Sequence, residues 1–309
     1  MTRTLTILGR GAIDVCRSPL LIAGALIVTL AAAAPFALIV GNQLQDALAN
    51  QPPIALGSGE IDADWWSEFR GHAEGLAATF TPTVIGFAAP LDNLSAILDG
   101  THRPPVLIVP VVTAAIVWAW FWGVVLTRLH ARGSYRHALA AGFRHLPRFV
   151  VISAAAAAAQ LVLYLTVHPL LFTVIAERVI TSGFSEPAAF AVRVVFYGVF
   201  VTLIATVSLA ADYTRIVQVA DRPDSARALL GQGAGFVARH FAAVIGLCAL
   251  IGLLLAILLT GYGALDIYGG SRVGGWRGVA LAQLYIIARL IIRLTNAAAE
   301  LRLFAAVRS

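Results

Sequence analysis

The chain of 309 residues contains no lysine, only two cysteines and one methionine, and charged residues make up 12% of it. So few charges exclude a disordered chain, because unfolded segments are rich in charge and poor in apolar residues. The cysteines Cys16 and Cys248 are far apart, which excludes a disulfide framework and a CxxC metal site. No Walker lysine, GxSxG or HExxH motif is present. We therefore predict no catalytic residue, no cofactor, no metal site and no enzymatic activity.

Apolar residues, by contrast, are abundant. They make up 59% of the chain, and the mean hydropathy is +0.84. One water-facing core cannot hide that much apolar surface, so the composition predicts an all-α polytopic membrane protein. The sequence pI is about 9.9, but the arginines fall at the ends of apolar runs. This placement indicates membrane topology and argues against nucleic acid as a partner.

Six apolar runs are long enough to cross a bilayer, which takes about 20 residues at helical rise. They cover residues 19–41, 105–127, 149–175, 188–211, 241–264 and 279–301 of a single membrane domain, 1–309. The first run resembles the apolar region of a signal peptide, and residues Ala47 to Ala49 resemble its cleavage site. However, the run is longer than the usual 7–15-residue apolar region of such peptides. We therefore expect it to be retained as the first span.

The distribution of arginine predicts the orientation. Fourteen arginines lie in the N-terminal segment, the 128–148 and 212–240 connections and the C-terminal tail, whereas five lie in the remaining connections. Because loops rich in Arg stay inside the cell, we expect both termini in the cytoplasm. The predicted location is the inner membrane of a bacterium.

A gapless threefold repeat precedes the odd-numbered spans. Each copy has Leu, then Gly three residues later, then Arg six residues beyond, in Leu8/Gly11/Arg17, Leu139/Gly142/Arg148 and Leu230/Gly233/Arg239. The pattern predicts three interfacial helices, anchored to anionic lipid headgroups by Arg17, Arg148 and Arg239, each followed by a transmembrane hairpin. The alternative is a set of ordinary basic loops selected for topology alone.

With its six spans and its Leu8/Gly11/Arg17-type modules, the chain resembles uncharacterised bacterial six-span integral membrane proteins. More loosely, it resembles the membrane domain attached to some glycerophosphodiester phosphodiesterases. The resemblance implies a helical membrane domain and carries no catalytic residues.

Residues 42–104 form the only large connection, with eight acidic residues and two arginines. This excess of acid suits the outer side of the membrane. Apolar residues recur at helical spacing from 62 to 80, and Trp65 and Trp66 fit the aromatic belt at headgroup depth. We expect a helical cap here that offers a docking face to a protein partner, or else a hairpin that rests on lipid without a partner.

The last span carries the strongest single feature, a polar stripe. Arg289, Arg293, Asn296 and Glu300 share one helical face. Two central arginines cost roughly 5–7 kcal/mol on insertion, so the stripe should turn toward other helices. It is a candidate site for an anion or a lipid headgroup, or for coupling in a transporter. Alternatively, Arg293 reaches the cytoplasm, Glu300 pairs with a neighbouring Arg and only Arg289 is buried.

Three further features lie on other spans. Asp212 is a candidate partner for Arg215 or for the polar stripe, and Gln160 is expected to hydrogen-bond a neighbouring helix. Trp118 and Trp122, one turn apart, form either an aromatic ligand shelf or ordinary packing. Two functions follow from the sequence: a non-enzymatic accessory component of a membrane complex, or a permease component that uses the polar stripe.

Overall fold

The computed structural model describes residues 2–49, 63–79, 88–101, 104–131, 133–181, 183, 185–223, 225–268 and 276–308. Six of its helical segments are long and apolar enough to cross a membrane. This confirms the predicted all-α, six-span fold, and no strand occurs in the described residues. The main helices are α1 (Thr2–Cys16), α2 (Pro19–Ala49), α5 (Ile108–Ala131), α6 (Tyr135–Pro169), α8 (Glu186–Ala220), α9 (Ala226–Arg239), α10 (Phe241–Tyr268) and α11 (Trp276–Arg308).

The spanning helices are longer than the apolar runs that predicted them. The candidate spans are Pro19–Asp46, Pro105–Ala131, Tyr135–Val179, Glu186–Ala220, Phe241–Asp266 and Trp276–Arg308. The runs marked only the apolar stretch, whereas the helices continue through polar residues on either side of it. In the third span a π-helix, Leu170–Ile175, follows Pro169 and leads into α7 (Ala176–Thr181). Because proline has no N–H to donate, it interrupts the hydrogen-bond pattern of an α-helix, and the π-helix begins directly after it.

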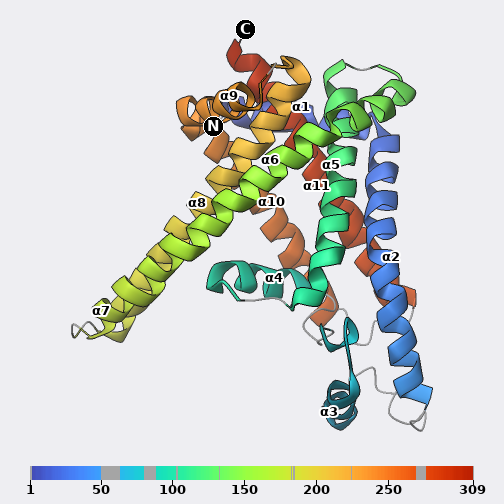
Figure 1. Ribbon diagram of the computed structural model, residues 1–309, viewed down its shortest axis with the longest axis vertical. Coiled ribbons are helices and arrows are strands. Elements are labelled where there is room, and N and C mark those ends of the chain that lie inside the picture. Colours follow the sequence, from blue (N-terminus) through green and yellow to red (C-terminus); the bar gives the residue numbers. More distant parts are fainter. Residues whose placement is uncertain are drawn as a thin grey trace.

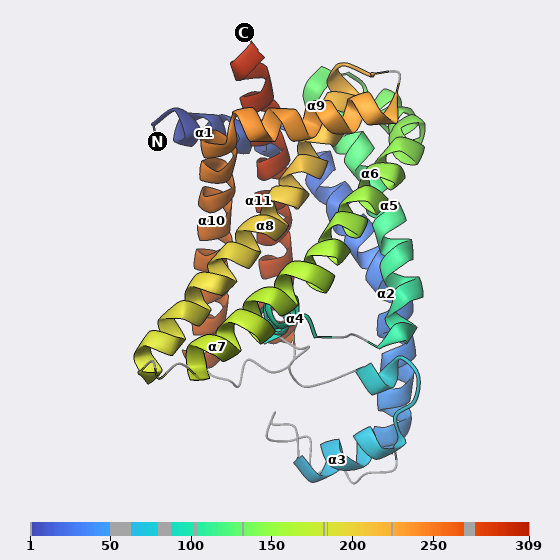
Figure 2. The same cartoon turned by 60° about the vertical axis from the view of Figure 1, so that its left-hand side comes forward.

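Both chain ends lie at one end of the bundle, together with α1, α9 and the start of α6 (Figure 1). We call this the arginine-rich end. Figure 2 shows that α1 and α9 run across the ends of the spanning helices there. α3 (Ala63–His72), α4 (Ala88–Asp99) and α7 lie toward the opposite end. The segments that the arginine count placed on one side of the membrane therefore do gather at one end.

The six spans form three hairpins: α2 with α5, α6 with α8, and α10 with α11. The second helices of these hairpins, α5, α8 and α11, also contact one another in pairs. Each of the three receives the repeat segment of the following copy, since the start of α6 packs on α5, α9 packs on α8, and α1 packs on α11. The order closes on itself, which makes the chain a cyclic arrangement of three copies around α5, α8 and α11.

The glycine of the repeat explains these three joints. A Cβ added at Gly11 would lie 3.0 Å from the backbone nitrogen of Ala299, and one at Gly233 would lie 2.7 Å from Cα of Thr214. A Cβ at Gly142 would lie 2.9 Å from the backbone oxygen of Trp120. Glycine has no Cβ and therefore lets two helices approach this closely without displacing either, as at small-residue contacts between membrane helices. The repeat predicted from three matched columns thus marks three equivalent contacts.

The second copy departs from the prediction of a separate interfacial helix. α6 continues from Tyr135 into the third span without a break. In the first copy Ser18 ends one hydrogen-bonded run and begins the next, since its N–H binds Val15 and its carbonyl accepts from Leu21. In the third copy His240 caps α9 at its C-terminus. The equivalent residue of the second copy, Phe149, is fully buried and stays helical, so no turn forms.

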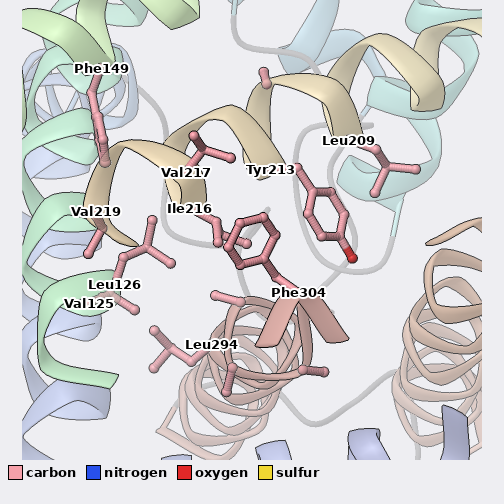
Figure 3. Close-up of a cluster of buried hydrophobic side chains, with 14 of the residues drawn as sticks. Val125, Leu126, Phe149, Leu209, Tyr213, Ile216, Val217, Val219, Leu294 and Phe304 are labelled. Carbon is pink, nitrogen blue, oxygen red and sulfur yellow. The ribbon is translucent and has the colours of Figure 1, made fainter. Parts of the chain in front are cut away.

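The buried core lies where the three second helices meet, toward the arginine-rich end. Figure 3 shows Leu126 of α5, Ile216 of α8 and Leu294 of α11 directed toward one another. Tyr213 stacks on Phe236 of α9 with ring centroids 4.7 Å apart, and Phe236 contacts Phe304. This aromatic row joins an interfacial helix to two spanning helices, so it helps to fix the cyclic arrangement.

The described part of the outer connection contains α3, which lies within the predicted 62–80 stretch, and α4. α3 includes Trp65 and Trp66, whose side chains lie outside the described set, so their role as anchors stays a prediction. α4 starts two residues before Pro90 and ends at Asp99, and Gly100 directly after it has a φ of +64°. It is fastened to its own chain, since Tyr164 donates to the carbonyl of Ile97 at 2.6 Å and Tyr197 to Asp99 at 2.8 Å.

Candidate ligand cavity

A cavity of about 290 Å³ lies between the three second helices, and we call it the axial cavity. α5 contributes Trp118 and Trp122, α8 contributes Asp212 and Arg215, and α11 contributes Arg293, Asn296 and Glu300, with Ser153 of α6 beside them. Leu126 and Ile216, both seen in Figure 3, belong to the cavity wall and to the core alike. All these residues belong to helices long and apolar enough to span a membrane.

The repeat explains why three distant segments line one cavity. The glycine contacts make Val124, Thr214 and Ala299 equivalent positions of α5, α8 and α11. Counted from them, Trp122, Asp212 and Ala297 stand at one equivalent position, and Trp118 and Arg293 at another. The three helices therefore turn the same face inward. The inward face of α5 carries the aromatic residues, that of α8 carries an ion pair, and that of α11 carries part of the predicted stripe.

Asp212 and Arg215 form an ion pair one helical turn apart on α8. Arg215 also donates to Ser153 Oγ at 3.0 Å, so its guanidinium links α8 to α6. The side chain of Asp212 keeps 37% of its surface accessible, compared with 16% for Arg215. Asp212 is therefore the more accessible member of the pair. Of the two partners that the sequence offered for Asp212, the structure pairs it with Arg215.

The guanidinium of Arg293 lies over two indole rings. Its guanidinium carbon is 4.1 Å from the ring centroid of Trp118 and 5.2 Å from that of Trp122. Stacking satisfies the face of a guanidinium, but it leaves the N–H donors in the plane free to bind an acceptor. No ion pair or hydrogen bond holds these donors within the described part of the chain. The side chain is also accessible, so a ligand can reach it.

Glu300 is a buried part of the wall of the axial cavity. Its side chain is 3% exposed, and Oε1 accepts a hydrogen bond of 2.9 Å from Asn296 Nδ2. A carboxyl group buried in a membrane span needs such a partner, because no water is available to solvate it. Asn296 and Glu300 therefore act as one polar unit beneath Arg293.

The structure brings together three of the four predicted stripe residues. Arg289 is exposed on the surface of α11 and does not line the axial cavity. The alternative reading, in which only Arg289 is buried, is wrong, because Glu300 is buried and its hydrogen-bond partner is Asn296. Arg289 lies one turn farther from the arginine-rich end, where α11 no longer faces the cavity.

The predicted interfacial anchors differ in their surroundings. Arg148 donates to Gln218 Oε1 at 2.9 Å and to the carbonyl of Pro223 at 2.7 Å. Arg239 donates to the carbonyl of Gly235 in its own helix, and Arg17 is exposed beside a second cavity. Only Arg148 is held by another segment of the chain, so lipid anchoring stays a prediction for all three.

Sequence reasoning found most of the axial cavity but not its assembly. Asp212, Arg215, Trp118 and Trp122 were noted separately, whereas Ser153 was missed because a lone serine in an apolar run carries no signal. The predicted bond of Gln160 is confirmed, since its Nε2 donates to Ser208 Oγ at 3.0 Å. Among the described residues no His, Cys, Asp and Glu cluster suits a metal ion.

Comparison of the chain with family models, with curated proteins and with solved structures gives no match. The resemblance to bacterial six-span families and to a phosphodiesterase membrane domain therefore stays a prediction.

Proposed function

We propose that this membrane protein binds a small solute with an anionic group in the axial cavity and moves it across the bilayer. The observation that carries the proposal is Arg293, a stacked but unpaired guanidinium inside a cavity among spanning helices. Ionisable residues inside membrane spans are costly and mark ligand pathways. This favours the permease component over the accessory component that the sequence also suggested. The accessory role has no comparable feature and stays a prediction, as does a protein partner at 42–104.

The chemistry of the wall defines the class of solute. Arg293 offers in-plane donors suited to a carboxylate or phosphate, which it can bind by two parallel bonds. Asp212 presents an accessible carboxylate on the opposite helix, which suits an ammonium or hydroxyl group. A volume of about 290 Å³ lies at the lower limit for ligand pockets, so the solute is a small one. An amino acid or a hydroxy acid has this combination of groups.

Thermal unfolding in detergent tests the binding step. We expect that one of acetate, lactate, glycine, glutamate or inorganic phosphate raises the unfolding midpoint by several degrees at about 100 times its dissociation constant. The Arg293→Gln variant should lose that shift. Arg289→Gln is the matched control, because it removes the same charge from the same helix outside the axial cavity. Equal loss in both variants, or no shift with any compound, contradicts the proposal.

Proteoliposomes test the transport step. The compound that shifts the midpoint should enter vesicles that contain the wild-type protein, and Arg293→Gln should reduce the initial rate about tenfold or more. A thermal shift without uptake would leave binding in place and overturn transport.

We place the arginine-rich end in the cytoplasm of a bacterial cell, with α3 and α4 outside, because arginine-rich loops stay inside. The chain provides its own probe, since Cys16 is exposed at this end and Cys248 is half-buried in α10. In a Cys248→Ser background, a membrane-impermeant maleimide should label Cys16 only after the inner membrane is permeabilised. Labelling in intact spheroplasts would reverse the orientation.

A further inference from the structure

A second cavity, of about 180 Å³, lies at the arginine-rich end between the first interfacial helix and the first hairpin. Asp14 and Arg17 of the α1 segment, Ser18 before α2, and Arg128 and Leu129 of α5 line it. α2 begins at Pro19, and the apolar run of the second span ends at residue 127. The cavity therefore lies where the spans leave the apolar layer, which is the depth of lipid headgroups.

The charges around this cavity do not cancel. Asp14 is engaged by Arg302 of α11, whose Nη2 and Nε lie 2.6 and 2.7 Å from Oδ2. Arg17 and Arg128 have no ion pair in the described part of the chain. Three guanidinium groups thus face one carboxylate. Two like charges at one cavity destabilise each other unless an anion lies between them.

In the second copy of the repeat, the equivalent arginine finds its hydrogen-bond acceptor within the chain. Arg148 is equivalent to Arg17, and Gln218, four residues after Thr214, is equivalent to Arg128, four residues after Val124. In the second copy the arginine donates to the glutamine oxygen at 2.9 Å. In the first copy an arginine replaces that acceptor. The chain therefore supplies two donors here and leaves the acceptor to come from outside.

The immediate surroundings of Arg128 hold its guanidinium at this cavity. The guanidinium carbon of Arg128 lies 4.8 Å from the ring centroid of Tyr135, and its Nε is buried without a partner in the described residues. Ser18 is 7% exposed and follows Arg17 directly, so its hydroxyl lies at the same cavity. A stacked arginine, a second arginine and a hydroxyl form a donor set that suits a tetrahedral oxyanion.

We propose that the Arg17–Arg128 cavity binds a phosphate group, supplied by an anionic phospholipid headgroup or by free phosphate. This inference goes beyond the proposed transport function and does not rest on it, because the axial cavity shares none of these residues. A headgroup bound here would join α1, α2 and α5 at the place where the first and last copies of the repeat meet.

The test measures binding to the purified full-length protein in a neutral detergent by native mass spectrometry and thermal unfolding. The probes are phosphatidylglycerol, phosphatidylcholine and inorganic phosphate, each titrated separately. We expect phosphatidylglycerol to bind and raise the unfolding midpoint. Arg128→Gln, which copies the second repeat, should weaken binding about tenfold or more. Arg136→Gln is the control, because Arg136 is an exposed arginine at the same end that lines neither cavity.

The outcomes separate the sources and the roles. Tighter binding of phosphatidylglycerol than of inorganic phosphate supports a lipid site. Binding of inorganic phosphate as tight as that of phosphatidylglycerol supports a free-phosphate site. In the absence of lipid, Arg128→Gln should be at least as stable as the wild type, because it removes one of two like charges at the same cavity. The proposal is overturned if none of the three probes binds, if phosphatidylcholine binds as tightly as phosphatidylglycerol, or if Arg136→Gln and Arg128→Gln weaken binding equally.

Discussion

The two ends of the bundle are held together in different ways. At the arginine-rich end, glycines of three repeat copies bring interfacial segments into contact with the backbone of α5, α8 and α11. At the opposite end, α4 is joined to α6 and α8 by side-chain hydrogen bonds from Tyr164, His168 and Tyr197. At the glycine contacts an added Cβ would force the helices to move, whereas at the opposite end each hydrogen bond can be removed without affecting the others.

This difference indicates where the chain is fixed and where it can yield. The axial cavity lies beside the glycine contacts, so its three walls are set by backbone packing. Toward the opposite end the α6–α8 hairpin inclines away from α2 and α5 (Figure 1). The transport that we propose needs a fixed binding region together with a part that moves. We expect the arginine-rich end to be the fixed part and the opposite end to be the moving part.

The largest effect is expected at Gly233. In Gly233→Ala the new Cβ would lie 2.7 Å from Cα of Thr214 and 2.0 Å from its Oγ1, so α9 must move off α8. We expect a loss of about 2–3 kcal/mol in the free energy of unfolding, measured with denaturant in detergent. Gly231→Ala is the control, because nothing lies within 4 Å of its Cβ position. It should gain up to about 1 kcal/mol from helix propensity, and equal effects would mean that the contact is unimportant.

A smaller effect is expected at Gly11, where the Cβ would lie 3.0 Å from the backbone nitrogen of Ala299. Gly11→Ala should cost about 1 kcal/mol, because tight packing against α11 outweighs the gain in helix propensity. The same unfolding measurement applies. Gly9→Ala, with nothing within 4 Å, should be neutral or stabilising. A gain at both positions would show that α1 is only loosely docked on α11.

The smallest effect is expected at the opposite end. Tyr197→Phe removes the hydrogen bond to Asp99, which is exposed, so the cost should be about 0.5–1 kcal/mol. Hydrogen exchange should rise in α4 and stay unchanged in α9, because the two ends are held independently. Tyr268→Phe is the control, since Tyr268 is 86% exposed. Increased exchange in α9 would mean that the ends are coupled.

Much of the fold could be predicted because a bilayer imposes simple rules on sequence. Long apolar runs located the six spans, and the arginine count grouped the connections that meet at one end. The repeat was visible in three columns, yet its meaning was not. That Gly11, Gly142 and Gly233 each meet a backbone depends on a partner helix from another copy, which periodicity within one segment cannot indicate.

The axial cavity was predicted in parts for the same reason. Helical spacing correctly placed Arg293, Asn296 and Glu300 on one face, but it also included Arg289, because spacing does not tell where a neighbouring helix ends its contact. The approach of Trp118 to Arg293 joins residues 175 positions apart and depends on how α5 and α11 are rotated. In the second copy the repeat segment and the third span form one continuous helix, and Phe149 at the junction looks like any other apolar residue in the sequence.

The salt bridge between Asp14 and Arg302 joins residues 288 positions apart. During synthesis α1 leaves the ribosome well before its docking partner exists, whereas α9 follows the helix it needs almost at once. We therefore expect the contact between α1 and α11 to be the last of the three glycine contacts to form. Until it does, we expect α1 to lie on the membrane surface, which suits its amphipathic face.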